Sequence, residues 1–379
     1  MRIELTDQQK KAQAAFREFA RTNVAPHAGE FDQQESLPAE LIKKVAAQGY
    51  LGATVPEASG GRQVDSITFG LLNEEIGRAC SSLRSLLTVH CMSTHAVYRW
   101  GSKHLKERFI PRMASGETVT AFALTEPDVG SDAKSVKTSA TLSGDSYILN
   151  GSKKWISFGQ VADLFLVFAQ SEGRPTALVV ERDSPGLSIT PITGLLGVRA
   201  SMVAELRFED CRVPVENLVG RAGVGFSHVA STALDLGRYS VACGCVGIAQ
   251  ACLESCVRYS NERTQFGSPI KDFQLIQAMT TEMIANVKAA RLLCYHAGFL
   301  RDAGDPRAII ETSIAKYFAS RTATKAAGDA VQIHGANGCS NHYPVERYLR
   351  DSKIMEIIEG STQMQQITIA RYGSQEILS

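Results

Sequence analysis

The sequence predicts an α+β protein in which helical domains stand on either side of a β domain. Apolar residues recur at helical spacing up to about residue 118 and again from about 227, whereas β-branched and aromatic runs separated by turn residues fill the middle. With 379 residues, 44% of them hydrophobic, the chain is long enough for several cores. We expect an N-terminal helical domain (1–118), a β domain (119–226) and a C-terminal helical bundle (227–379).

The N-terminal helical domain opens with a capping signal. Thr6 stands at the N-cap position and Gln9 three residues later, so their side chains can satisfy backbone N–H groups of the first turn. Two further helices are expected over 38–48 and 69–78, with Gly and Pro punctuation between them.

Five strands are expected in the β domain, paired as a compact antiparallel sheet: 118–124, 147–149, 163–168, 176–180 and 203–208. Strand patterns then disappear. Three long helical stretches follow, 238–259, 273–300 and 308–333, each long enough for an antiparallel bundle. Since there is no internal repeat, low-complexity linker or charge block, we expect the three parts to pack as one unit.

Composition argues against several function classes. Forty basic and thirty-nine acidic residues give a formal net charge of +1, so no overall field attracts nucleic acid or an anionic membrane. The N-terminus has no apolar signal region and no stretch reads as a transmembrane helix, so the expected location is the cytoplasm. Most of the nine cysteines lie in apolar patterns and are expected to be buried free thiols.

The usual nucleotide and metal signatures are missing from the sequence. The glycine-rich run 220–225 lacks the following acidic residue of a dinucleotide-binding βαβ unit, and no P-loop is present. The eight histidines form no HExxH motif, and Cys243 lies too close to Cys245 for ordinary paired zinc ligation. A nicotinamide enzyme, a P-loop enzyme and a metal site are therefore not expected.

Five short segments carry chemical information. Residues 124–132 (LTEPDVGSD) form a polar loop after an apolar strand, and residues 149–159 (LNGSKKWISFG) place a tryptophan and a hydroxyl on one strand between turns. Downstream follow RTQFG at 263–267, QIHGANG at 332–338 and IEGSTQ at 358–363. Taken alone, the first segment also fits a surface loop, Trp155 an ordinary core position and Arg263 a solvated helix end.

In this order the five segments resemble the motifs of the acyl-CoA dehydrogenase family, over residues 4–372. The resemblance implies the acyl-CoA dehydrogenase fold, with an N-terminal helical domain, a β-barrel-like middle domain and a C-terminal four-helix bundle. It also implies FAD as cofactor, an acyl thioester as substrate and a homo-oligomer, dimer or tetramer, in which part of each FAD site comes from a neighbouring subunit.

The resemblance assigns FAD contacts to the motif residues. Thr125 and Ser157 would hydrogen-bond the isoalloxazine ring and Trp155 would pack against it. Arg263 would hold the FAD of a neighbouring subunit, because a planar guanidinium pairs well with phosphate oxygens. The implied FAD contacts are Phe122, Leu124, Thr125, Ser131, Trp155, Ser157, Arg263, Phe266, Gln274, Gln332, Gly335, Gly338, Ser361 and Gln363.

Glu359 is the implied catalytic base. An α-hydrogen beside a thioester is too weakly acidic for water to remove, so the site needs a partly desolvated carboxylate and donors at the developing enolate oxygen. In the family, the N–H of this same position and a ribityl hydroxyl supply those donors, and hydride passes from the β-carbon to flavin N5. Some branches carry the base at the position that Gly237 occupies here, and Glu356 is expected to cap a helix or face solvent.

Substrate contacts are implied for Ser131, Asp235, Arg238 and Gly360, although Asp235 and Arg238 also fit a surface salt bridge. The segments 80–85, 237–248 and 353–361 resemble dehydrogenases of polyketide and nonribosomal-peptide clusters, which oxidise acyl groups on an acyl carrier protein. Arg84 is a candidate to hold a polar acyl group. The basic residues that are candidates to meet an acidic carrier protein are Arg84, Lys103, Lys106 and Arg108.

The main expectation is an FAD-dependent acyl-ACP dehydrogenase of polyketide or antibiotic biosynthesis, most like the methoxymalonyl-pathway type. The alternative is a catabolic short- or branched-chain acyl-CoA dehydrogenase that passes electrons to an electron-transfer flavoprotein. An acyl oxidase that uses oxygen and a catalytically idle helical scaffold are further alternatives. Bound flavin separates the scaffold from the enzymes, and the preferred thioester carrier separates the two dehydrogenases.

Overall fold

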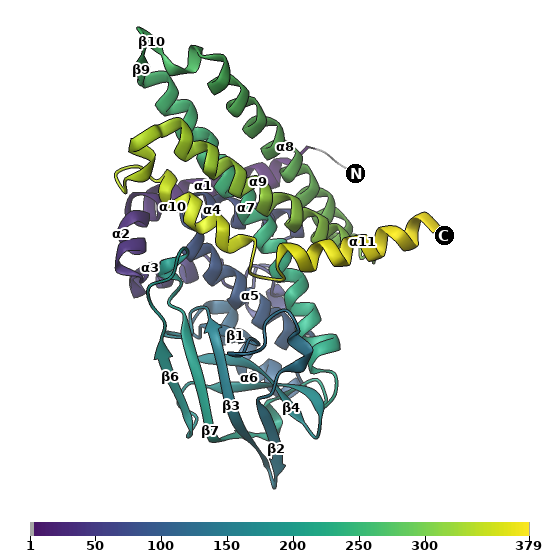
Figure 1. Cartoon of the computed structure of the whole chain (residues 1–379). Coiled ribbons are helices and arrows are strands. Elements are labelled where there is room, and N and C mark those ends of the chain that lie inside the picture. The colour runs from purple at the N-terminus through teal and green to yellow at the C-terminus, as the bar shows by residue number, and fades with distance from the viewer. Residues whose placement is uncertain (1–3, 379) are drawn as a thin grey trace.

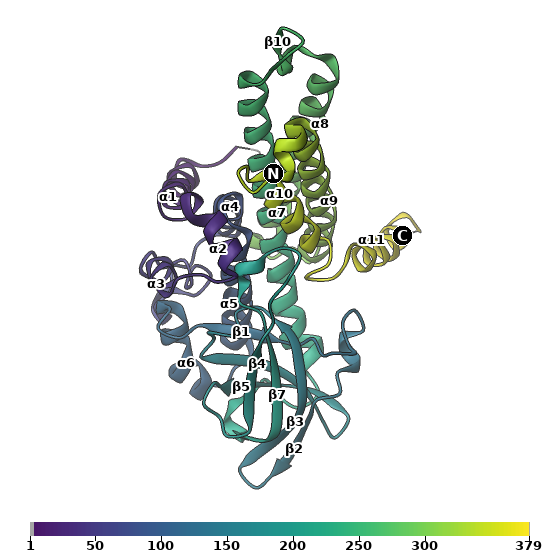
Figure 2. The same ribbon diagram turned by 60° about the vertical axis from the view of Figure 1, so that its left-hand side comes forward.

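The computed structural model describes residues 4–378 and places a β domain at one end of an elongated molecule (Figure 1). The N-terminal helices lie beside the middle of the molecule, and a hairpin of two long helices forms the opposite end in both ribbon views (Figure 2). The mixed helical and β architecture expected from the sequence is confirmed.

The N-terminal helical domain begins with the expected capping box. Thr6 Oγ1 accepts from the N–H of Gln9 at 3.2 Å, and Gln9 Oε1 accepts from the N–H of Thr6 at 3.0 Å. The helices are α1 (Asp7–Asn23), α2 (Ala28–Gln34), α3 (Ala39–Ala47), α4 (Ser66–Ala79), α5 (Ser81–Trp100) and α6 (Lys103–Ser115). The bounds of α5 were not predicted, because most of this helix is buried and shows no clear polar face.

The strands of the β domain are β1 (Thr120–Ala123), β2 (Ser139–Ser143), β3 (Ser146–Ile156), β4 (Leu164–Ser171), β5 (Arg174–Glu181), β6 (Leu187–Pro191), β7 (Ala204–Pro214) and β8 (Leu218–Val219). Their order is β6-β7-β3-β2-β4-β5-β8, and β1 pairs with β4 in parallel. Most strand pairs are antiparallel, as expected, but the parallel pairings of β1 with β4 and of β2 with β4 were not predicted. About forty residues, including the β2–β3 hairpin, separate β1 from β4, which is enough chain for a crossover that reverses direction twice.

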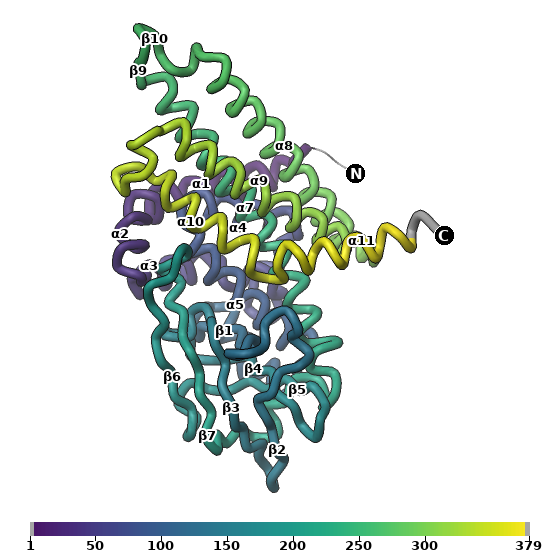
Figure 3. Tube along the Cα trace, viewed as in Figure 1, coloured from purple at the N-terminus to yellow at the C-terminus, as the bar shows by residue number. Residues whose placement is uncertain are grey.

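The C-terminal domain is built around α7 (Ser231–Glu262), α8 (Gln274–Asp302) and α9 (Ala308–His334), with the shorter α10 (Val345–Met355) packed on α7 and α9. The short strands β9 (Thr264–Gln265) and β10 (Ser268–Pro269) close the α7–α8 hairpin, and α11 (Thr362–Leu378) extends away from the body (Figure 3). The stretch Gly225–Glu262 is long and apolar enough to span a membrane, but 72% of its most apolar window is buried inside the molecule. We therefore interpret α7 as a core helix.

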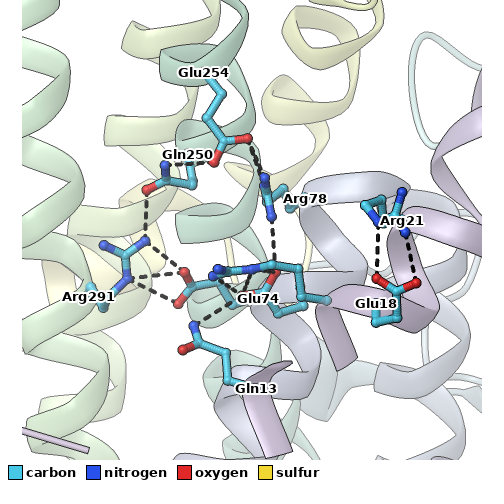
Figure 4. A network of polar contacts seen from close by, with 10 residues as sticks. Gln13, Glu18, Arg21, Glu74, Arg78, Gln250, Glu254 and Arg291 are labelled. Atoms are coloured by element: carbon cyan, nitrogen blue, oxygen red, sulfur yellow. Dashed lines mark hydrogen bonds and ion pairs between the residues drawn. The ribbon is translucent and has the colours of Figure 1, made fainter. Parts of the chain in front are cut away.

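A network of charges around two buried carboxylates joins the two helical domains (Figure 4). Glu74 on α4 pairs with Arg291 on α8 at 2.7 Å, and its neighbour Glu75 pairs with Arg17 on α1 at 2.8 Å. Arg78 extends the network to α7. Because a buried carboxylate is costly unless it is paired, these contacts fix how α1 and α4 sit on the C-terminal helices.

The cysteines follow the expectation of buried free thiols. All are unpaired, and all but Cys339 are buried. Within residues 4–378 no group of three or more His, Cys, Asp or Glu side chains is placed to hold a metal ion.

Candidate active site

Glu359 lies in the turn between α10 and α11, where it adopts a left-handed conformation with φ of 54°, followed by Gly360 with φ of 86°. Its carboxylate rests against Gly237 of α7. A β-carbon at residue 237 would come within 2.6 Å of Glu359 Oε2 and 2.5 Å of Met92 Sδ. Glycine at this position thus leaves room for the carboxylate, and a side chain at residue 237 would require the ends of the Glu359 and Met92 side chains to shift.

The Glu359 carboxylate is desolvated and only partly compensated. Among the described residues its Oε2 is buried without a hydrogen-bond partner. Burial raises the pKa of Glu359 to about 7, although the positive charges of Arg238, Lys316 and Arg84 act to lower it. A carboxylate whose pKa lies near neutrality suits a general base, because it is both ionised in good part and basic enough to take a proton.

The backbone of the turn is held by three side chains. Arg238 Nε donates to the Glu359 carbonyl at 3.3 Å, and Lys316 Nζ donates to the Gly360 carbonyl at 2.8 Å. Gln365 Nε2 donates to both carbonyls, at 3.2 and 3.1 Å. Within the described chain, the main-chain N–H of Glu359 donates no hydrogen bond. The turn therefore combines a basic carboxylate with an unused N–H donor on one residue, which is the pair that enolate formation requires.

The two motif segments of the β domain lie side by side. The N–H of Lys154 donates to the Thr125 carbonyl at 2.9 Å, which joins the loop after β1 to strand β3. Trp155 has φ of 63° within an irregular part of the β3–β7 pairing, and 52% of its surface is exposed. The hydroxyls of Thr125 and Ser157 bond to no other described residue and both side chains are partly exposed.

A buried ion pair joins these segments and was missed by sequence reasoning. Lys153 Nζ lies 2.7 Å from Glu126 Oε1 and 3.0 Å from the Leu124 carbonyl. Glu126 also accepts from Lys137 N at 2.6 Å, and from the N–H and hydroxyl of Thr138. Burial lowers the pKa of Lys153 to about 8, while Glu126 acts to raise it. The sequence held a clue to this pair, since Glu126 and Lys153 each belong to one of the two motif segments and carry opposite charges.

Six further sequence-predicted FAD residues form a second group at the opposite end of the molecule from the β domain. A cleft of about 360 Å³ lies at the tip of the α7–α8 hairpin, lined by residues that include Arg263, Phe266 and Gly335. Phe266 is 96% exposed. Figures 1 and 2 place this tip at the end opposite the β domain. One chain therefore does not bring the two groups together: the β-domain group is Phe122, Leu124, Thr125, Ser131, Trp155 and Ser157, and the hairpin group is Arg263, Phe266, Gln274, Gln332, Gly335 and Gly338.

The other predicted residues near the turn have simple surroundings. Ser361 Oγ accepts from the N–H of Met364 at 3.4 Å, at the start of α11, and Gln363 is exposed. Asp235 pairs with Arg301 at 2.6 Å and not with Arg238. Glu356 pairs with Lys353 at 2.6 Å.

The expectation that Arg84 meets a carrier protein was wrong. Arg84 is 1% exposed, because α5 runs through the core, and it bonds to Thr88 at 2.7 Å and to Ser85 at 3.1 Å. The other three predicted cations remain at the surface near local partners. Arg108 pairs with Glu181 at 2.6 Å, Lys103 lies 3.7 Å from Glu107, and Lys106 lies over the ring of Tyr98.

The β-domain residues fit a planar, hydrogen-bonding cofactor such as a flavin. Trp155 presents aromatic surface that the chain itself leaves half uncovered, and the free hydroxyls of Thr125 and Ser157 flank it along the same two segments.

Comparison with known proteins decides the family. Models of the acyl-CoA dehydrogenase N-terminal, middle and C-terminal domains match residues 6–117, 121–211 and 223–373 in order. A probable acyl-CoA dehydrogenase of Bacillus subtilis, YngJ, is 40% identical over 378 residues, covering 98% of this chain and 99% of the relative. The chain belongs to the acyl-CoA dehydrogenase family. It is accordingly an oxidoreductase of an FAD-dependent family.

Two further acyl-CoA dehydrogenase family members extend the comparison. Acryloyl-CoA reductase (NADH) of Anaerotignum propionicum is 39% identical, with 98% of this chain and 95% of the relative covered. The structure of butyryl-CoA dehydrogenase from Megasphaera elsdenii matches with a TM-score of 0.94 at 34% identity, over 98% of this chain and 99% of that one.

Two further structures are less similar in sequence than these acyl-CoA enzymes. FkbI, described for biosynthesis of a methoxymalonyl extender unit, matches with a TM-score of 0.88 at 31% identity, covering 96% of this chain and 99% of that one. The prolyl acyl carrier protein oxidase AnaB is 28% identical, with a TM-score of 0.92, covering 97% of this chain and 99% of that one. The comparisons therefore favour the acyl-CoA alternative over the carrier-protein expectation.

Proposed function

We propose that this protein is an acyl-CoA dehydrogenase for short or branched acyl chains, in which Glu359 removes the substrate α-proton. The observation that carries the proposal is the turn at Glu359, where a buried carboxylate with a pKa of about 7 and an unused N–H belong to one residue. FAD, when bound, supplies the acceptor for the hydride that leaves the β-carbon.

The chain's own residues prepare the substrate for this step. The N–H of Glu359 donates to the thioester oxygen as negative charge develops there, and the carboxylate takes the proton from the neighbouring carbon. Thr125 and Ser157 would hydrogen-bond the flavin ring when it is bound, and Trp155 would lie against it. Arg263 and the rest of the hairpin group would hold the FAD of a neighbouring subunit, so we propose a homo-oligomer, a dimer or a tetramer.

Two observations support CoA as the carrier. Several similar relatives are acyl-CoA enzymes by name, including a short-chain-specific acyl-CoA dehydrogenase of Clostridium acetobutylicum that is 36% identical over 376 residues, covering 98% of this chain and 99% of the relative. Of the cations proposed for carrier-protein docking, Arg84 is buried and Arg108 is paired. An acyl carrier protein remains the second candidate, supported by the similarity to FkbI and AnaB.

Arg84 is our candidate for holding a polar acyl group. Its guanidinium is buried and no described carboxylate lies within ion-pair distance, so its near partners are neutral: the hydroxyls of Thr88 and Ser85 and the sulfur of Met355. An oxygen-bearing acyl end would supply an acceptor.

We also propose an electron-transfer flavoprotein as the electron acceptor and the cytoplasm as the location. A structure from Acidaminococcus fermentans described as an electron-transferring flavoprotein matches this chain with a TM-score of 0.95 at 38% identity, which supports such a partner.

The test is anaerobic reduction of the bound flavin by the same butyryl group presented on CoA and on an acyl carrier protein. We expect rapid loss of flavin absorbance with butyryl-CoA. Faster reduction by the carrier-protein thioester would instead support a biosynthetic enzyme that acts on acyl carrier proteins. A protein that binds no flavin, or that neither thioester reduces, would refute the dehydrogenase proposal.

A further inference from the structure

Lys316 on α9 is a fully buried cation beside the catalytic turn. Its side chain has 0% exposure, and its one hydrogen bond among the described residues runs from Nζ to the Gly360 carbonyl at 2.8 Å. No described carboxylate lies within ion-pair distance of it. A buried ammonium loses its hydration and is costly unless another interaction compensates, so its placement on a carbonyl calls for an explanation.

We infer that Lys316 is a positioning residue for Glu359. By holding the Gly360 carbonyl it fixes the left-handed turn, and so aims both the carboxylate and the main-chain N–H of Glu359 at the substrate. The inference rests on the proposed dehydrogenase function, since it concerns the geometry of that base.

The conformation of the turn needs such a restraint. Glu359 has φ of 54°, a region that a residue with a β-carbon adopts at an energetic cost, and Gly360 follows with φ of 86°. The carbonyls of these two residues are held from three elements: α7 through Arg238, α9 through Lys316 and α11 through Gln365. Lys316 bonds only the Gly360 carbonyl, whereas Gln365 divides its donor between the Glu359 and Gly360 carbonyls. Lys316 therefore anchors the C-terminal part of the turn.

The ammonium also acts on the base electrostatically. Burial lowers the pKa of Lys316 to about 8, Cys245 and Glu359 act to raise it and Arg238 to lower it, so charge remains near the base at neutral pH. The charged and titratable groups around Lys316 are Cys245 and Arg238 on α7 and Glu356 and Glu359 on the turn, with Arg84 of α5 also acting on Glu359. Removing this cation should raise the pKa of Glu359.

The experiment compares Lys316→Met with a matched control, Lys325→Met. Methionine keeps much of the buried stem and removes the donor and the charge. Lys325 lies on the same helix, is exposed and pairs with Asp329 at 2.6 Å. For Lys316→Met we expect kcat with butyryl-CoA to fall roughly 10- to 100-fold with KM within about twofold, because orientation of the base and its N–H acts on the transition state. The acid limb of kcat/KM should move to higher pH.

A readout without turnover separates positioning from general damage. Acetoacetyl-CoA has an acidic α-carbon between two carbonyls and readily forms an enolate, so it probes the base and the N–H without turnover. It should bind Lys316→Met more weakly than wild type, whereas Lys325→Met should match wild type in affinity, kcat and pH profile. If Lys316→Met fails to fold, Gln365→Met tests the same restraint from α11 by the same measurements. A folded variant, Lys316→Met or in its place Gln365→Met, with the kcat, pH profile and enolate affinity of wild type would overturn the inference. Failure of wild type itself to be reduced by any acyl thioester would instead overturn the proposed function.

Discussion

At the scale of the residue, Glu359 owes its chemical character to what surrounds it. Gly237 leaves the space that its carboxylate occupies, and burial removes the water that would otherwise stabilise its charge. Three cations stand near enough to lower its pKa, but none bonds to Oε2. The carboxylate is thus kept ionisable near neutral pH without being tied up in an ion pair.

We expect Glu359→Gln to abolish substrate oxidation while leaving the fold intact. Glutamine fills the same space but cannot accept the proton, and a positioned general base contributes on the order of 10²- to 10⁴-fold to a rate. Anaerobic stopped-flow reduction of the flavin by butyryl-CoA measures the loss. The control is Glu356→Gln, which alters a nearby carboxylate that pairs with Lys353. Its flavin should be reduced by butyryl-CoA at close to the wild-type rate.

The pH dependence of the enzyme should follow the same carboxylate. Since Glu359 must be ionised to act and burial raises its pKa to about 7, kcat/KM should rise between pH 5.5 and 8 and then level off. The effect on stability has the opposite sign. A folded-state pKa above the ordinary 4.5 favours the protonated folded protein, so this group lowers the free energy of unfolding as the pH rises from 4.5 toward 7. A pH–rate profile that is flat across this window would contradict the assignment.

At the scale of the element, the loop after β1 and the strand β3 behave as one unit. The Lys153–Glu126 pair and the bond from Lys154 N to the Thr125 carbonyl join them, and the irregular pairing near Trp155 turns this side chain outward. The buried pair and the main-chain bond thus hold together the two segments that carry Thr125 and Ser157.

Breaking that pair should be costly. Lys153→Met leaves Glu126 buried without its positive partner, although the hydrogen bonds from Lys137 and Thr138 remain. Removing one partner of a buried pair lowers the free energy of unfolding by about 3 to 5 kcal/mol. Lys154→Met is the matched control on the neighbouring residue, since the Lys154–Glu205 pair is partly exposed at 3.7 Å and should contribute less than about 1 kcal/mol. Urea unfolding measures the free energy of unfolding of each variant. If both variants lose the same amount relative to wild type, the buried pair has no special role in stability.

Local signals made much of the fold predictable, whereas long-range contacts did not. The capping box at Thr6 and the three long C-terminal helices follow from nearby residues and appear as expected. The parallel pairing of β1 with β4 depends on a distant partner that no periodicity reveals. Arg84 was misplaced at the surface because arginine is rarely fully buried, and the contact of Lys316 with residue 360 spans 44 positions.

At the scale of the whole molecule, the β-domain group and the hairpin group of sequence-predicted FAD residues lie at opposite ends of one chain. The hairpin tip carries apolar surface that a lone chain would leave in water, above all Phe266 at 96% and Leu275 at 80% exposure. Exposed apolar surface of this kind commonly marks an interface. Both features agree with the homo-oligomer that we propose.

We expect the double variant Phe266→Asp/Leu275→Asp to form smaller assemblies, because the new charges oppose burial of the hairpin tip against another chain. The same variant should also lose bound FAD. Size-exclusion chromatography with light scattering gives the assembly size, and flavin absorbance gives the cofactor content. Leu142→Asp on β2, where the leucine is 56% exposed, is the control and should leave both unchanged. A variant that keeps wild-type size and full flavin would place the interface elsewhere.

The distance between the base and the hairpin tip within one chain also has a genetic consequence. If each site takes its base from one chain and its hairpin from another, a chain with Glu359→Gln and a chain with Arg263→Ala are damaged in different halves of the shared site. In a mixed assembly one site receives both defects, while the other receives an intact base and an intact hairpin. Two alleles that are each inactive should therefore complement each other when expressed in the same cell, and the restored activity should fade on dilution as the mixed assembly dissociates.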